Sequence, residues 1–141
     1  MTTSFTHRLR VRFVECDMHG MVFNGHYAAF MDVAFTEFWR ERAGSYAAFS
    51  GTGLATAVAD LRVRFRSPAF FDDELDIAVT TESMSTTSMT TTYRFTRGED
   101  LIAEGELRHV CIDGEDHGKR PWPEDLRAAL GGADTGTGPA A

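Results

Sequence analysis

The stretch Val14-Glu-Cys-Asp-Met-His-Gly-Met-Val-Phe-Asn-Gly-His-Tyr27 lies between two segments whose apolar residues follow different periods. Before it, apolar and arginine side chains alternate over residues 7–14, which predicts a half-buried strand. After it, apolar residues cover nearly every side of residues 25–43 at helical spacing, so we expect a helix enclosed by the rest of the domain. One carboxylate, Asp17, is therefore expected in a glycine-containing loop, seven residues before the start of that helix.

Asp17 and the start of the helix together suggest chemistry at a carbonyl group. The first amides of a helix have no partner inside the helix, and the helix dipole makes them favour negative charge. A nearby carboxylate can supply or activate a nucleophile while the amides hold the developing oxyanion. Asn24 is a favoured cap residue, and Gly25 lets a ligand approach the backbone closely. The structural alternative is that Asp17 only makes a turn before the helix.

The rest of the chain predicts four more strands and a short closing helix. The strands are expected at residues 57–65, 75–79, 86–96 and 101–112, with a hairpin turn at residues 97–100. The helix is expected at residues 123–130, with Pro123 at its start and Gly44 as the end of the long helix. One strand, one long helix and four strands is an α+β order, in which the helix packs on a single antiparallel sheet.

Length and composition restrict the class of protein. The 141 residues suit one domain, expected at residues 1–130, followed by a tail at 131–141 that has nothing to bury and should be disordered. A formal net charge of -7 argues against nucleic acid and against an anionic membrane surface as partners. No apolar run is long enough to span a membrane, no signal peptide is recognisable, and two cysteines suit reduced thiols. A cytoplasmic location is the expectation.

The loop and helix closely resemble the active-site segment of the 4-hydroxybenzoyl-CoA thioesterase family, which has the hotdog fold. The pattern Asp-x-x-Gly-x-Val-x-x-x-x-Tyr is present without a gap as Asp17, Gly20, Val22 and Tyr27. The likeness continues through residues 27–38, resumes at 66–77 and 119–127, and covers roughly residues 6–130. The resemblance implies a five-stranded antiparallel sheet wrapped around one long central helix, and hydrolysis of an acyl thioester.

By this resemblance Asp17 is the catalytic carboxylate, either as a base that activates water or as a nucleophile that forms an acyl anhydride. The backbone amides of Asn24 and Gly25 would hold the oxyanion. Substrate contacts are expected from the rest of the loop and from one arginine: His19, Gly20, Val22, Phe23, Tyr27 and Arg66. No cofactor and no metal are expected, because Cys16 and His19 have ligand-like spacing but no matching second pair.

Two other features have both a structural and a functional interpretation. Asp32 falls within the apolar helix, where we expect a buried, hydrogen-bonded acid; the alternative is a second active-site carboxylate. Arg62, Arg64 and Arg66 form a basic stripe that is either a solvated strand face or a track for the phosphates of CoA or phosphopantetheine. Where relatives place basic residues that grip CoA, this chain has a polar segment at residues 82–89, so a carrier-protein thioester is an open alternative.

The predicted function is hydrolysis of an acyl-CoA or acyl-carrier-protein thioester. The resemblance implies a homodimer whose sheets join edge to edge, and a homotetramer of two such dimers, which would cover the sheet edges that a monomer exposes. One alternative is a hotdog dehydratase or hydratase, for which His19 and His26 are the nearby histidines. The other is a binding module for acyl thioesters without catalysis. The sequence does not identify the acyl group.

Overall fold

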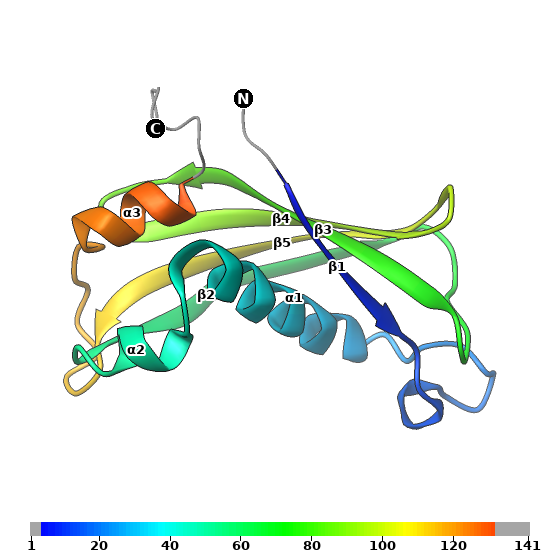
Figure 1. Cartoon of the computed structure of the whole chain (residues 1–141). Coiled ribbons are helices and arrows are strands. Elements are labelled where there is room, and N and C mark those ends of the chain that lie inside the picture. The colour runs from blue at the N-terminus through cyan, green and yellow to red at the C-terminus, as the bar shows by residue number, and fades with distance from the viewer. Residues whose placement is uncertain (1–3, 132–141) are drawn as a thin grey trace.

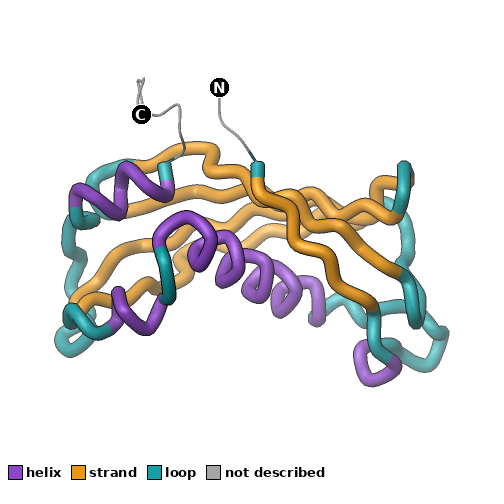
Figure 2. The backbone as a smooth tube through the Cα atoms, viewed as in Figure 1, coloured by secondary structure: helices purple, strands orange, loops and turns teal. Residues whose placement is uncertain are grey.

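The computed structural model describes residues 4–131, which form one sheet with helices on one of its faces (Figure 1). The strands are β1 (Phe5–Arg10), β2 (Leu54–Phe65), β3 (Glu74–Met84), β4 (Ser88–Arg97) and β5 (Asp100–Asp113). The helical elements are a 3-10 turn η1 (Phe13–Glu15), α1 (His26–Ala43), α2 (Tyr46–Ser50) and α3 (Glu124–Leu130). All strand pairs are antiparallel, in the order β1-β3-β4-β5-β2. The predicted α+β architecture, a five-stranded sheet curved around one long helix, is confirmed (Figure 2).

The helix α1 packs along the concave face of the sheet and supplies much of the core. Its buried side chains are Tyr27, Phe30, Met31, Ala34, Phe35, Phe38 and Trp39. The closest approach is at Gly105 of β5, where an added Cβ would lie 2.7 Å from the sulfur of Met31. Because glycine has no side chain, the sheet can bring its backbone against the helix at this point. The helix ends at Gly44, which has a positive φ of 87°, as the sequence predicts.

The short helices α2 and α3 lie at the end of the sheet where α1 ends (Figure 1). The sequence does not predict α2, whose Tyr46 and Phe49 rings pack against Trp39. The helix α3 agrees with its prediction, and its buried Leu130 carbonyl accepts a hydrogen bond from Thr81 of β3 at 2.7 Å. These contacts close the core at one end of α1. The opposite end, where α1 begins, therefore carries the loops.

The first strand is shorter than predicted. It ends at Arg10, not at residue 14, because Val11 exchanges backbone hydrogen bonds with the segment before β3: its amide donates to Asp73 and its carbonyl accepts from Asp72, both at 2.9 Å. The chain then turns into η1, so that Phe13 is 78% exposed where the alternation predicts a buried side chain. The turn moves the following loop to the end of the molecule at which α1 begins.

The two edges of the sheet differ in character. The edge strand β1 carries the exposed Arg8 and Arg10, which pair with acidic side chains of β3 and of the segment before it. The other edge strand, β2, has a bulge between Val58 and Asp60 and presents three large apolar side chains on the helix side that are about half exposed: Val58, Leu61 and Phe65. An unpaired apolar edge is a surface that natural proteins normally cover.

Within residues 4–131 no helix has the length and apolarity needed to cross a membrane. The tail predicted at residues 131–141 lies outside the described residues, except for Gly131.

Candidate active site

The loop that begins the quoted stretch folds into a small hairpin. The amide of Asp17 donates to Met21 at 2.8 Å, and the amide of Phe23 donates to Glu15 at 2.9 Å, so the strands on both sides of the loop are paired. Gly20 has a positive φ of 80°, which glycine adopts without strain, and its amide closes the turn on the carbonyl of Asp17 at 2.9 Å. The predicted glycine-containing loop around Asp17 is therefore a rigid turn.

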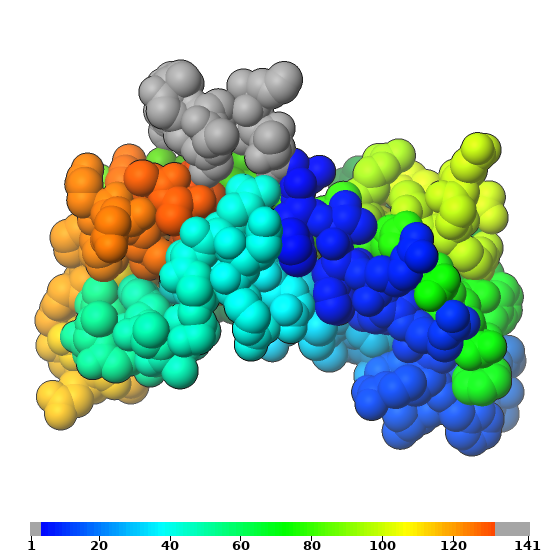
Figure 3. Space-filling view, viewed as in Figure 1, coloured from blue at the N-terminus to red at the C-terminus, as the bar shows by residue number. Residues whose placement is uncertain are grey.

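A second segment, residues 66–73, holds the hairpin from the other side. The amide of Val22 donates to the carbonyl of Ala69 at 2.9 Å, and Met21 forms an isolated β-bridge with Phe70. In the space-filling view the hairpin, in blue, and the start of β3, in green, form one lobe at the end of the molecule (Figure 3). The position of Asp17 is thus set by backbone bonds on both sides of its loop.

The carboxylate of Asp17 is bound through one oxygen and open through the other. Its Oδ1 accepts the backbone amides of His19 at 2.9 Å and Met21 at 3.3 Å. Its Oδ2 accepts no hydrogen bond within residues 4–131, and the side chain is 30% exposed. The imidazole Nδ1 of His19 lies 4.0 Å from Oδ1. The group is oriented by its own loop while one oxygen remains available to a substrate or to water.

The start of α1 presents two open amides. The amides of His26 and Tyr27 donate to the carbonyls of Phe23 and Asn24 at 2.9 and 3.2 Å. The amides of Asn24 and Gly25 donate to no group in the described part of the chain. The prediction that the Asn24 side chain caps the helix is wrong: Gly25 is the cap residue, no side chain caps it, and the carbonyls of the preceding turn satisfy the first helical amides. The open amides still lie at the positive end of an 18-residue helix.

Phe23 forms a wall beside these amides. Its ring is about half exposed and meets the His26 ring edge to face at 6.1 Å between centroids. A Cβ at Gly25 would lie only 3.0 Å from Cε2 of Phe23, so glycine is what lets the ring lie against the helix start. Farther out, large apolar side chains of the hairpin and of the neighbouring segment are exposed: Phe13, Val14, Met18, Phe70 and Phe71. An apolar surface of this size beside the loop suits an acyl group or a second protein chain.

The other predicted contact residues lie in different surroundings. Val22 and Tyr27 are buried, and the Tyr27 ring packs against Phe30 and Phe95 of the core and against the half-exposed Phe65. Arg66 donates through Nη2 to Glu104 of β5 at 2.9 Å. The structure therefore gathers Asp17, His19, Gly20, Phe23, Asn24 and Gly25 around one loop, whereas Val22 and Tyr27 support it from the core and Arg66 is engaged on the sheet.

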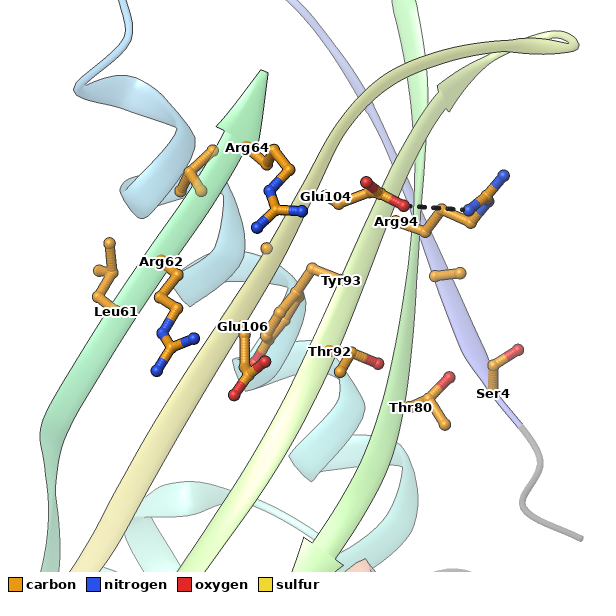
Figure 4. Close-up of a pocket in the computed structure, with 13 residues that line it drawn as sticks. Ser4, Leu61, Arg62, Arg64, Thr80, Thr92, Tyr93, Arg94, Glu104 and Glu106 are labelled. Atoms are coloured by element: carbon orange, nitrogen blue, oxygen red, sulfur yellow. Dashed lines mark ion pairs between the residues drawn. The ribbon is translucent and has the colours of Figure 1, made fainter. Parts of the chain in front are cut away.

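Arg62 and Arg64 of the basic stripe lie on the face of the sheet opposite α1 (Figure 4). A groove of about 880 Å³ runs over this face, lined by arginines of β2 and β4 and by Glu104 and Glu106 of β5. Arg62 pairs with Asp60 at 3.3 Å, and Arg94 pairs with Glu104 at 3.5 Å. Acidic side chains thus pair with Arg62, Arg66 and Arg94, as expected for a solvated strand face, and the groove is on the opposite side of the sheet from the helix.

Asp32 and Cys16 are the other acidic and thiol groups that the sequence singles out. The expectation of a buried Asp32 is wrong: its side chain is exposed, although most of its neighbours in α1 are buried. Partial burial, with Asp17 and Glu15 nearby, raises the pKa of the Cys16 thiol, which disfavours a thiolate nucleophile. Within residues 4–131 no three potential metal-ligating side chains are close enough to hold an ion.

The sequence reading did not single out Glu15. Its side chain is buried, and it receives three hydrogen bonds from Arg12: from the backbone amide at 2.8 Å, from Nε at 3.0 Å and from Nη2 at 2.6 Å. Burial acts to raise the pKa of this carboxyl, but the bonds from Arg12 outweigh it and the pKa lies below its usual value. The spacing of an arginine three residues before a glutamate is the only signal in the sequence, and such pairs are common on surfaces.

Comparisons with known proteins identify the family of this chain. A family model described as the thioesterase-like superfamily matches residues 11–130. The chain is similar to the acyl-CoA thioester hydrolase YbgC of Escherichia coli O6:H1, at 33% identity over 90% of this chain and 96% of that protein. It is also similar to 1,4-dihydroxy-2-naphthoyl-CoA hydrolase of Nostoc punctiforme, at 27% identity over 87% of this chain and 84% of that protein.

Solved structures give the same result for the fold. A hypothetical protein from Thermus thermophilus superposes with a TM-score of 0.84 at 30% identity, over 89% of this chain and 95% of that chain. A 1,4-dihydroxy-2-naphthoyl-CoA thioesterase from Synechocystis has the same fold, with a TM-score of 0.84 at 22% identity, over 91% of this chain and 95% of that chain. Because the family model spans most of the chain and includes the Asp17 loop, the chain belongs to the thioesterase-like superfamily, whose members are hotdog-fold thioester hydrolases.

Proposed function

We propose that this protein hydrolyses an acyl-CoA thioester to a free acid and CoA thiol, with Asp17 as the reacting carboxylate. The observation that carries the proposal is that one loop and the helix start after it present both a carboxylate oxygen and backbone amides without hydrogen-bond partners. The Oδ2 oxygen of Asp17 and the amides of Asn24 and Gly25 all lack partners in the described residues, while backbone hydrogen bonds of Asp17, Gly20, Val22 and Phe23 hold the loop in place. A carboxylate together with free helix-start amides is what attack on a thioester carbonyl requires.

Two routes balance chemically, and both use the same groups. In the first, Oδ2 takes a proton from water, the water oxygen bonds to the acyl carbon, and the carbon–sulfur bond breaks as the thiolate leaves. In the second, Oδ2 itself bonds to the acyl carbon, the thiolate leaves, and water then opens the mixed anhydride. Transfer of ¹⁸O from labelled water into the Asp17 peptide during a single turnover would support the second route.

The amides of Asn24 and Gly25 would receive the carbonyl oxygen in either route. Removing one such donor in other enzymes costs roughly 10²–10³ in rate. Phe23 and the exposed apolar side chains near the loop would contact the acyl group. Acyl-CoA is the class favoured by the names of the relatives, and a carrier-protein thioester is the alternative. Release of thiol from a panel of CoA and carrier-protein thioesters tests the activity and ranks the substrates.

We also propose that two copies pair through the β2 edge. The apolar Val58, Leu61 and Phe65 are half exposed there, whereas the β1 edge is charged and paired with acids, so a second copy would cover the edge that needs cover. The Phe65 ring contacts Tyr27 at 5.1 Å, one helical turn from Asn24, so the interface would adjoin the start of α1. Light scattering coupled to size exclusion reads whether dimers form and whether they pair into tetramers.

A further inference from the structure

We propose that Glu15, held by Arg12, is a positioning residue that fixes the Asp17 carboxylate relative to the open amides of Asn24 and Gly25. This inference rests on the proposed function, because it assigns a task in that reaction. It concerns a residue that contacts neither substrate nor reacting atoms and acts through its neighbours.

Glu15 is the residue at which the two halves of the site meet. Its carbonyl accepts the amide of Phe23 at 2.9 Å, directly before the open amides. Two residues after it in the chain is Asp17, whose own amide is paired with Met21. The bond between Glu15 and Phe23 therefore joins the two ends of the loop that contains Asp17, directly before Asn24. A shift of residue 15 would move the carboxylate and the amides relative to each other.

The side chain of Glu15 holds residue 15 in place through Arg12 alone. Both carboxylate oxygens are used: Oε1 accepts the Arg12 amide, and Oε2 accepts its Nε and Nη2. Together with the bond from the Glu15 amide to the Arg12 carbonyl at 3.0 Å, these contacts lock η1 as a single turn. The position of η1 then determines where the chain leaves β1 and enters the hairpin.

This ion pair differs from the surface pairs elsewhere on the molecule. The Glu15 side chain is only 8% exposed, whereas that of Arg12 is 74% exposed. A buried carboxylate that loses its only cationic hydrogen-bond partner must find water or move, whereas an exposed one simply rehydrates. Loss of Arg12 is therefore expected to displace residue 15.

The expected consequence is a loss of turnover without loss of binding. Misplacement of reacting groups by about 1 Å costs up to ~10² in rate, because attack requires a near-reactive geometry. The exposed apolar side chains beside the loop would be untouched. We therefore expect Glu15→Gln and Arg12→Gln each to lower kcat at least ~10-fold, while the Kd of a non-hydrolysable thioether analogue of the best substrate changes by less than about 2-fold.

The test compares these two variants with their double variant in the full chain. If Glu15 acts through Arg12, the double variant should be no more than about 3-fold slower than the slower single variant, because both remove one coupled interaction. The control is Arg8→Gln, which breaks the exposed bidentate pair between Arg8 of β1 and Asp76 of β3. It should leave kcat unchanged. Because the Arg12 side chain is exposed, Arg12→Gln should still fold, so it tests the inference even if Glu15→Gln lowers the yield of folded protein.

Unchanged kcat in Arg12→Gln, in a protein that Asp17→Asn inactivates, would overturn the inference and leave the proposed function standing. Multiplicative losses in the double variant would overturn it as well, because the two residues would then act separately. Full activity in Asp17→Asn would instead remove the proposed function itself, and the positioning role with it.

Discussion

The imidazole of His109 lies flat against the ring of Phe35, with centroids 4.0 Å apart and planes inclined by 10°. His109 comes from β5 and is buried, and its Nδ1 has no hydrogen-bond partner among the described residues. Burial lowers the pKa of this histidine from 6.5 to about 4. The core of the protein thus contains an ionisable group that folding keeps neutral.

This histidine predicts a loss of stability in mild acid. Above pH 6.5 both folded and unfolded chains hold it neutral, so it makes no difference. As the pH falls towards 4, the unfolded chain takes up a proton that the folded chain refuses, so the free energy of unfolding should fall by about 1 kcal/mol per pH unit. Urea unfolding of the wild type and of His109→Leu at a series of pH values measures the difference. Equal slopes for the two proteins between pH 6.5 and 4 would refute the assignment.

Replacing Asp17 should abolish hydrolysis without unfolding the protein. Asp17→Asn keeps an oxygen for the amides of His19 and Met21 but removes the charge, and we expect turnover to fall at least ~10². Asp17→Ala should be as inactive and somewhat less stable. The matched control is Asp116→Asn, an exposed loop aspartate that likewise accepts a backbone amide, from Gly118. Thiol release above a tenth of wild type in Asp17→Asn would contradict the catalytic role.

The turn at Gly20 predicts a graded response to substitution. Nothing lies within 4 Å of an added Cβ, so the only cost is the positive φ of 80°. Gly20→Ala should lower the free energy of unfolding by about 1 kcal/mol, whereas Gly20→Asn, a residue that adopts this region more readily, should lower it less. Because the turn orients Asp17, turnover should fall in the same order. Thermal unfolding and thiol release of both variants test this prediction. Equal stability of the two variants would show that the positive φ does not determine the cost of substitution at residue 20.

The β2 edge predicts a mutation that weakens self-association. Leu61→Lys places a charge among the half-exposed apolar side chains of that edge, and the dimer dissociation constant should rise at least about 10-fold. Thiol release at low protein concentration should decline together with the dimer fraction. Thr6→Lys, an exposed position on the opposite edge strand, is the control and should leave association unchanged. Sedimentation velocity measures the dimer fraction of both variants. A dimer dissociation constant that is unchanged in Leu61→Lys would argue for a different interface.

The sequence predicted the main elements because each depends on contacts that repeat along its own length. The period of apolar residues located α1 within one residue of its observed start, and the strands at residues 75–79, 86–96 and 101–112 all lie within observed strands or within two residues of their bounds. The pattern around Asp17 and Gly20 also identified the family, which the family model confirms. The individual roles of the site residues remain predictions.

Where pattern and structure differ, the cause lies in segments distant along the chain. The strand at residues 7–14 is cut short because Val11 bonds with Asp72 and Asp73, and Phe13 is consequently exposed. Asp32 is exposed although its sequence neighbours are apolar, since only one side of α1 faces the sheet.

By itself, the sequence determined the order of strands and helix and the loop that carries Asp17, because periodicity and local turn chemistry depend on neighbours a few residues apart. The superfamily followed from the resemblance of that loop to a known family. Only the tertiary structure decided which oxygen of Asp17 is open, which amides at the start of α1 lack partners and that Glu15 is buried against Arg12. Those properties depend on how the hairpin, α1 and residues 66–73 fit together, and hydrogen-bond satisfaction and burial are properties of the assembled chain.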